Sequence, residues 1–232
     1  MIRLPLLLPG NVCFPPVSQA LKEPNGLLAM GGDLEVSSLV KAYQQGIFPW
    51  FNEGEPILWW SPDPRLVLFP STVHISRSLQ KTFNRKNFSF TFDQSFNDVI
   101  TACAAPRSKQ AGTWITPAML SAYRALHKQG IAHSIECWQG DQLVGGLYGV
   151  AIGRVFFGES MFSNVSDASK CALIALAKQL HAWQFGLIDC QVESDHLISM
   201  GAETLSRESF LNYLERYCSL PGPEQWSITV DI

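Results

Sequence analysis

The sequence predicts an α+β fold, with a small N-terminal α/β domain at residues 1–62 and a larger domain at residues 63–232. Hydrophobic residues make up 47% of the 232 positions, enough for a sizeable core. Three segments with the alternating residue pattern of β-strands lie at residues 132–138, 143–150 and 155–158. Short turns separate them, and together they predict an antiparallel meander. An apolar helix at residues 167–183 and a strand at 187–192 follow. The helix can return the chain parallel to the last strand of the meander, which predicts a mixed sheet.

The N-terminal region is rich in Pro, Gly and Trp, and it predicts one helix at residues 35–45. Asp33 or a nearby serine is the expected N-cap, and Gly46 the terminator. Five aromatic residues fall within the thirteen positions 48–60: Phe48, Trp50, Phe51, Trp59 and Trp60. They either join the small domain to its neighbour or, for one or two of them, stack against a ligand. The Ser-Pro-Asp-Pro turn at residues 61–64 predicts the domain boundary.

The second domain is expected to begin with a strand at residues 66–69 and a helix at 74–83. Arg77, Lys81 and Arg85 are spaced by four residues, which places them on one helix face, and Lys86 is adjacent. Such a row is either a solvated surface or a contact for phosphates. The net charge of −3 argues against a generally basic nucleic-acid binder but leaves room for a local basic patch.

Five further elements complete the expected order. A strand at residues 88–92 precedes a helix that starts near Asp93 or Ser95 and ends near residue 103. Thr116 as N-cap, Pro117 as first helical residue and Gly130 as terminator bracket a helix at 117–129. The last expected elements are a short helical turn up to Met200 and a helix at 207–217.

Glu159 is a carboxylate among aromatic and apolar residues, within the segment 144–163. Small residues at 145, 146, 149, 153 and 158 would let another backbone or a ligand approach this segment closely. On the strand 187–192, Asp189 and Gln191 alternate to the same face. If that strand pairs beside 155–158, the three side chains converge and could bind a cation, hold an amine or relay a proton. The alternative is a polar outer face on the sheet.

Other kinds of site are not indicated. The six cysteines contain no Cys-x-x-Cys pair and no metal-ligand spacing, so we expect a reduced protein with no metal. No phosphate-binding glycine loop is present, so no cofactor is expected. Cys190 is expected to be a core residue and not a nucleophile. No apolar segment is long enough to cross a bilayer, and we expect a cytoplasmic protein with no membrane partner.

Several motifs occur in a specific order: GIFPWF (46–51), WWSPDPR (59–65), GTWI (112–115), GGLYG (145–149), FFGESMFS (156–163) and DCQV (189–192). In order and spacing the chain resembles bacterial leucyl/phenylalanyl-tRNA–protein transferases over nearly its whole length. The resemblance implies transfer of Leu or Phe, less well Met, from aminoacyl-tRNA to the N-terminal Arg or Lys of acceptor proteins. The product would be marked for N-degron proteolysis.

The resemblance also implies that the C-terminal domain is like the GNAT-type N-acetyltransferases. Their acetyl-CoA signature is absent, however, and SNVSDAS (163–169) stands in its place. Two competing readings follow. One is an acetyltransferase of related fold that uses a CoA thioester, and the other is a non-catalytic module that binds basic N-termini or tRNA ends. We expect a monomer.

The resemblance assigns roles to individual residues. Asp189 orients Gln191, which draws on the amino group of the acceptor, while Glu159 contacts the basic acceptor residue. Whether the first two relay a proton or position substrates stays open. The expected walls of the donor side-chain pocket are Leu147, Phe156, Met161 and Ile188. The expected contacts of the terminal adenosine are Trp50 and Trp114, completed by Tyr43 and Gly158. The expected tRNA phosphate contacts are Arg77, Lys81, Arg85 and Lys86.

Overall fold

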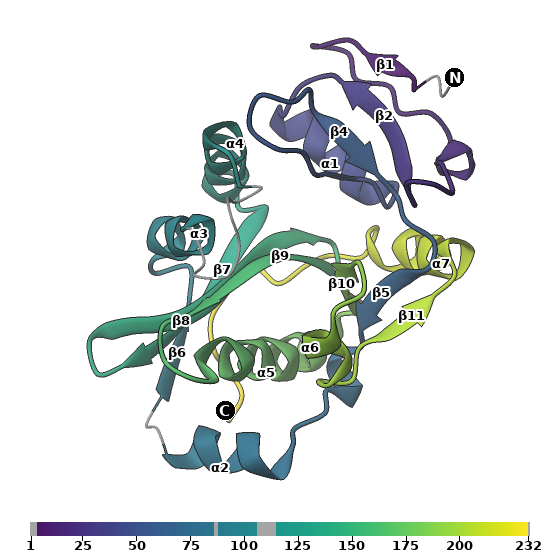
Figure 1. The fold of residues 1–232 in the computed structure, drawn as a ribbon. Coiled ribbons are helices and arrows are strands. Elements are labelled where there is room, and N and C mark those ends of the chain that lie inside the picture. Colours follow the sequence, from purple (N-terminus) through teal and green to yellow (C-terminus); the bar gives the residue numbers. More distant parts are fainter. Residues whose placement is uncertain (1–3, 86–87, 106–114, 232) are drawn as a thin grey trace.

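The computed structural model describes residues 4–85, 88–105 and 115–231, which form two sheets (Figure 1). The smaller sheet has the order β1-β2-β4-β3. Its strands are β1 (Leu6–Leu7), β2 (Leu27–Gly31), β3 (Phe48–Pro49) and β4 (Leu58–Trp60). The helix α1 (Val36–Gln44) packs against it, and η1 (Val17–Gln19) is a short 3-10 turn. These strands are only two to five residues long, which is why the sequence pattern did not predict them.

The larger sheet has the order β11-β5-β10-β9-β8-β7-β6. Its strands are β5 (Arg65–Leu68), β6 (Phe88–Phe92), β7 (Ala132–Gln139), β8 (Gln142–Ile152), β9 (Val155–Ser163), β10 (Leu187–Gln191) and β11 (Glu203–Leu205). The meander β7-β8-β9 is antiparallel, and β10 pairs with β9 in parallel. The α+β class and the mixed sheet are therefore confirmed. The small sheet ends at Trp60 and the large one begins at Arg65, and a domain division at residues 62 and 63 stays a prediction.

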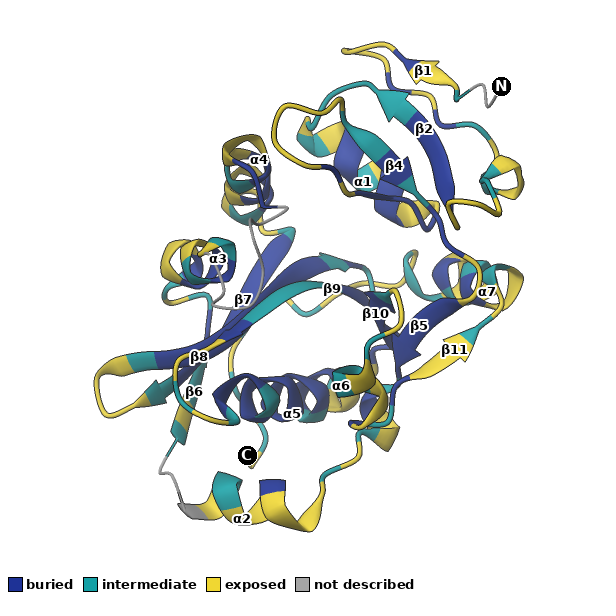
Figure 2. Cartoon of the chain, in the orientation of Figure 1, coloured by how far each residue is buried: buried dark blue, intermediate teal, exposed yellow. Residues whose placement is uncertain are grey.

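Helices cover both faces of the larger sheet. On one face lies α5 (Ala168–Ala182), which is buried over most of its length (Figure 2). Below it in Figure 1 runs α2 (Arg77–Arg85), which follows the 3-10 turn η2 (Pro70–Thr72). On the other face lie α3 (Phe96–Ala104) and α4 (Pro117–Lys128), with α1 beside them. The elements α6 (Asp195–Ile198) and α7 (Arg207–Tyr217) complete the chain. Because α5 is buried over most of its length, most of its residues are apolar.

Several expected boundaries differ from the observed ones, and three of these differences have a clear cause. The helix expected from residue 74 begins at Arg77, because the Ser76 hydroxyl accepts a hydrogen bond from the backbone N–H of Leu79, as an N-cap does. The strand expected to end at 158 runs to Ser163, because it keeps its pairing with β8. The strand expected to reach 192 ends at Gln191, where φ is +60°.

Candidate functional site

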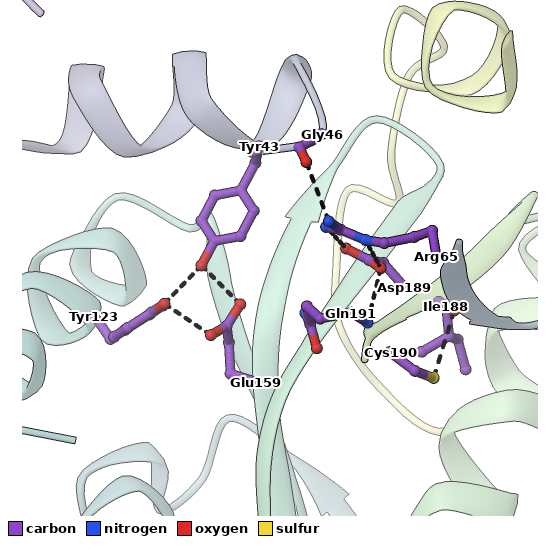
Figure 3. Close-up of polar contacts among 9 residues, drawn as sticks. All are labelled: Tyr43, Gly46, Arg65, Tyr123, Glu159, Ile188, Asp189, Cys190 and Gln191. Carbon is purple, nitrogen blue, oxygen red and sulfur yellow. Dashed lines mark hydrogen bonds and ion pairs between the residues drawn. The ribbon is translucent and has the colours of Figure 1, made fainter. Parts of the chain in front are cut away.

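The strands β9 and β10 pair only as far as Phe157 and Asp189, and each then carries a bulge. On β9, Ser160 pairs with Tyr148 of β8, and Gly158 pairs with the next residue, Gly149. Glu159 lies between them and has no partner on β8, so it is the extra residue of the bulge. On β10, Asp189 pairs with Val67 of β5, and Gln191 pairs with Leu66. Cys190 lies between them and is the extra residue of the second bulge. A bulge bends its strand and redirects side chains, and bulges are frequent next to active sites. The three predicted residues Glu159, Asp189 and Gln191 thus lie around the point where the two strands stop pairing (Figure 3).

Asp189 is fully buried and forms a two-point ion pair with Arg65. Arg65 Nε lies 2.8 Å from Oδ1, and Nη2 lies 2.7 Å from Oδ2. Nη1 donates to the carbonyl oxygen of Gly46 at 3.2 Å, and the guanidinium lies 4.7 Å from the ring centres of both Phe48 and Phe210. The sequence did not predict this pairing, because the two residues are 124 positions apart. The charge of Asp189 is compensated, and both of its carboxylate oxygens are engaged.

Asp189 also fixes the backbone of Gln191. Its Oδ1 accepts the backbone N–H of Gln191 at 3.0 Å, and Gln191 has the left-handed φ of +60°. A non-glycine residue in this region is uncommon and is frequent at active sites. The regular strand expected through this segment is interrupted here, because a register shift lies between Asp189 and Gln191. Asp189 acts here as an anchor for the chain at Gln191.

The side-chain amide of Gln191 has an unsatisfied donor. Its Nε2 atom is buried and has no hydrogen-bond partner within the described part of the chain. Leaving a buried donor unpaired costs about 1–3 kcal/mol, so such groups in native proteins call for an explanation. Figure 3 shows this amide between the Arg65–Asp189 pair and Glu159.

Glu159 forms a ring of short contacts with two tyrosine hydroxyls. Its Oε1 lies 2.7 Å from the Tyr43 hydroxyl, its Oε2 lies 2.8 Å from the Tyr123 hydroxyl, and the two hydroxyls are 2.6 Å apart. Burial raises the pKa of both tyrosines well above the usual value, so they keep their protons. Three contacts require three protons, but two tyrosines and a carboxylate supply two. When Glu159 is protonated, its own proton allows all three contacts to be hydrogen bonds.

Burial also raises the pKa of Glu159 to about 7, and the hydrogen bonds from Tyr43 and Tyr123 oppose this increase. The sequence identified Glu159 as an unusual carboxylate but did not predict Tyr123 as its partner. At neutral pH the group is therefore poised between its neutral and ionised forms.

Glu159→Gln is expected to remove a pH-dependent part of the stability. The folded-state pKa is raised from 4.5 to about 7, so the folded protein holds this proton more tightly than the unfolded chain. The stabilisation is fully present below pH about 4.5 and is lost as the pH rises through about 7. The stability of the native protein relative to Glu159→Gln should fall by roughly 2–3 kcal/mol over this range. Urea unfolding at several pH values measures it, and parallel curves for the two proteins would contradict the assignment.

The four residues expected to line the donor side-chain pocket gather on the other face of the sheet. Leu147, Phe156 and Ile188 are buried in the core cluster that includes α5, and Met161 packs against it. Tyr43 and Tyr123 belong to the opposite core cluster, with α1, α3 and α4. The four residues are thus brought together, and their role in binding an amino-acid side chain stays a prediction.

The glycines of this region have different surroundings. A Cβ atom at Gly149 would lie 2.3 Å from the carbonyl oxygen of Phe157, and one at Gly145 would lie 2.6 Å from Ala168 Cβ. Close backbone atoms likewise exclude a side chain at Gly146 and Gly153, at 2.8 and 2.4 Å. At Gly158 the nearest atom would be 3.5 Å away, which is ordinary contact. Packing within the protein therefore explains four of the five small residues, but it does not require a glycine at Gly158, beside the end of the β9–β10 pairing.

The remaining predicted contacts are more scattered. Trp50 is 46% exposed and packs against Trp60, whose Nε1 donates to the Trp50 carbonyl at 2.7 Å. Tyr43, expected beside the adenosine, is fully buried with its hydroxyl on Glu159. Arg77 and Lys81 are exposed on α2, which also contains Arg85. Two further predicted residues, Trp114 and Lys86, lie outside the described residues.

Other candidates for chemistry are structural. Cys190 is buried, and burial raises the pKa of its thiol strongly, so it is a poor nucleophile. His133 bonds to Asp93 at 2.7 Å and to the Gly130 carbonyl at 3.1 Å.

Among residues 4–85, 88–105 and 115–231, no group of three His, Cys, Asp or Glu side chains is arranged to hold a metal. None of the helices in those ranges has the length and apolar character to span a membrane.

Comparison with known proteins gives a consistent result. The family model described as "Leucyl/phenylalanyl-tRNA protein transferase" matches residues 67–215, and the model for its N-terminal domain matches residues 32–63. A leucyl/phenylalanyl-tRNA–protein transferase of Ectopseudomonas mendocina is 57% identical over 92% of this chain and 94% of its own. One of Nitrosomonas europaea is 60% identical over 90% of this chain and 89% of its own.

Among solved structures, L-PGS from Bacillus licheniformis aligns at a TM-score of 0.41 and 11% identity, over 72% of this chain and 54% of that one. A likeness at this level carries no argument about the fold.

Proposed function

The chain belongs to the leucyl/phenylalanyl-tRNA protein transferase family, and we propose how this aminoacyltransferase selects and joins its substrates. It moves Leu or Phe, less well Met, from aminoacyl-tRNA to the N-terminal Arg or Lys of acceptor proteins, which then enter N-degron proteolysis. It acts as a monomer in the cytoplasm, where aminoacyl-tRNA is found. The observation that carries this proposal is the group of Glu159, Asp189 and Gln191 around the end of the β9–β10 pairing.

The reaction is aminolysis of an ester that is already activated. It needs no ATP, metal or covalent nucleophile, only a positioned neutral amine and stabilisation of the developing charge. The site offers an amide on an anchored backbone and a carboxyl, which suits this chemistry. Since both oxygens of Asp189 are engaged by Arg65, we assign Asp189 a positioning role and not that of a proton relay.

Glu159 is proposed to bind the basic side chain of the acceptor. An approaching guanidinium or ammonium group favours the ionised form of a carboxyl whose pKa is about 7. Tyr43 and Tyr123 hold both oxygens of Glu159 in place, so its orientation is set before the acceptor arrives. The preference for Arg or Lys follows from this opposite charge.

The donor is proposed to bind next to this group. Its apolar side chain enters between Leu147, Phe156, Met161 and Ile188, which gather on the α5 face. Its terminal adenosine lies against Trp50 and Trp114, with Gly158 leaving room for close approach. Tyr43, through its bond to Glu159, connects the donor and acceptor sites. We also propose that the meander, α5 and β10 form a GNAT-type arrangement, in which SNVSDAS (163–169) replaces the CoA-binding loop.

Transfer of labelled Phe tests the proposal directly. The protein is incubated with labelled Phe-tRNA and a peptide that begins with Arg, and the label is expected to appear on the peptide. Binding of peptide or tRNA without transfer would instead identify a non-catalytic module. Thermal stabilisation by acetyl-CoA, and none by phenylalanyl-adenosine, would identify an acetyltransferase.

Replacing Arg77 and Lys81 by Ala is expected to weaken tRNA use. Both side chains are exposed on α2, and each phosphate contact adds about one to the slope of log affinity against log salt. The slope should therefore decrease by roughly two, with a higher KM for Phe-tRNA. Transfer from the minimal donor phenylalanyl-adenosine should be unchanged. Gln80→Ala, an exposed neutral position on α2, is the control, and equal losses with both donors would exclude phosphate contact by this face.

A further inference from the structure

The unpartnered amide of Gln191 is the feature that the proposed function does not yet explain. Its Nε2 is buried and without a partner in residues 4–85, 88–105 and 115–231. It lies between the Glu159–tyrosine ring and the Arg65–Asp189 pair, at the end of the β9–β10 pairing (Figure 3). A buried hydrogen-bond donor beside the proposed site is suited to an acceptor atom that arrives with the substrate.

We propose that Gln191 Nε2–H donates to the carbonyl oxygen of the aminoacyl ester and to the oxyanion formed from it. The proposal rests on the proposed function, since it assigns an atom of that site to one bond of the donor. It differs from the role implied by the family resemblance, in which Gln191 draws on the acceptor's amino group. Gln191 is then a catalytic residue of the oxyanion-hole type.

The chemistry of a primary amide favours the carbonyl over the amine. The attacking amine needs its lone pair, and an N–H donated to that lone pair would make the amine a weaker nucleophile. An amide nitrogen has no basic lone pair, and an amide oxygen is too weak a base to remove a proton. The ester carbonyl, in contrast, gains negative charge as the reaction proceeds, and an N–H donor stabilises that charge more strongly in the transition state than in the ground state.

The surrounding contacts hold the backbone that carries this donor before the substrate arrives. Arg65 clamps both oxygens of Asp189, and Asp189 Oδ1 accepts the backbone N–H of Gln191 at 3.0 Å. The backbone of Gln191 is thereby kept at φ +60°, a conformation that the chain would otherwise avoid. A donor that is fixed in advance does not have to reorganise during the reaction, which is the basis of oxyanion-hole catalysis. Arg65 and Asp189 are positioning residues in this scheme.

The reaction step balances without another reagent. The α-amine nitrogen forms a bond to the ester carbonyl carbon, and the C=O π electrons move onto the oxygen that Gln191 Nε2–H contacts. When the carbonyl re-forms, the bond to the ribose oxygen breaks. The proton of the former amine passes to that oxygen, which leaves as the ribose hydroxyl of the tRNA. The products are a peptide bond and deacylated tRNA.

Gln191→Glu and Gln191→Met separate the two roles. The test uses single-turnover transfer of labelled Phe from Phe-tRNA to an Arg peptide. With a donor role, both variants are expected to lose about 10²–10³-fold in rate at pH 8, with little change in KM. Because a glutamic acid can donate only when protonated, the rate of Gln191→Glu relative to native protein should rise as the pH falls. A rate ratio for Gln191→Glu that rises with pH would overturn the proposal, because it would show an acceptor acting on the amine. Full activity in Gln191→Met would also overturn it.

Two controls keep the test interpretable. Ser61→Ala removes another buried oxygen without a partner, remote in sequence from the bulges, and should leave the rate unchanged. Thermal unfolding shows whether each variant is folded. If Gln191→Glu does not fold, the rate of Gln191→Met, which introduces no charge, tests the role of the amide. Absence of transfer by the native protein would refute the proposed function itself. Transfer by the native protein together with an unaffected Gln191→Met would refute only the role of the amide.

Discussion

Replacing Arg65 by Met is expected to lower the free energy of unfolding by about 3–5 kcal/mol, because it leaves the carboxylate of Asp189 buried without a counter-charge. Arg65 and Asp189 are both fully buried, and no water can replace the missing partner cheaply. The same change frees Asp189 and therefore the backbone of Gln191, so transfer should fall as well. Urea unfolding and single-turnover transfer measure the two effects.

The double variant Arg65→Met with Asp189→Leu is the matched control. A buried ion pair replaced by apolar side chains of similar size is often neutral for stability, whereas removal of one partner is not. The double variant should therefore regain most of the stability lost by Arg65→Met while transfer stays low. If both single and double variants are as stable as the native protein, the ion pair contributes little. If the double variant also transfers Phe normally, the pair does not position Gln191.

Gly149→Ala is expected to destabilise the protein by about 1–3 kcal/mol or more, the range for inserting atoms into a packed core. The new methyl group would lie 2.3 Å from the carbonyl oxygen of Phe157 and 2.5 Å from the ring of Phe156. The backbone of β9 would have to move away from β8 at the bulge that presents Glu159. Thermal unfolding measures the loss of stability, and the transfer assay measures the displacement of the site.

Gly158→Ala, at the directly paired position on β9, is the control for this change. Its methyl group would meet nothing closer than 3.5 Å, so the stability should be nearly unchanged. Transfer should nevertheless fall, because the donor is proposed to approach this residue. Equal stability of both variants would show that β8 and β9 can separate easily. Full activity in Gly158→Ala would place the donor elsewhere.

Much of the fold could be predicted because its causes are local. Alternating apolar residues gave β6 to β10, and Thr116 and Pro117 gave the start of α4, where the Thr116 hydroxyl accepts the N–H of Met119. The parallel return of β10 beside β9 followed from the helix that joins them. The small strands β1 to β4 and β11 are too short to show a pattern, and they are stabilised by pairing and packing with distant segments.

The sequence by itself determined the chemical inventory of the site: an isolated Glu159, the Asp189–Gln191 pair and glycines along β8 and β9. Only the tertiary structure decided what surrounds each of them. It paired Asp189 with Arg65, gave Glu159 its two tyrosines, and distinguished Gly158 from glycines that serve packing. The physical reason is that charge compensation, burial and close contact depend on residues from different elements of the fold, such as Arg65 and Asp189, which are 124 positions apart, whereas periodicity and capping depend on near neighbours. The bulges at Glu159 and Cys190 likewise arise from pairing between strands, which no local pattern specifies.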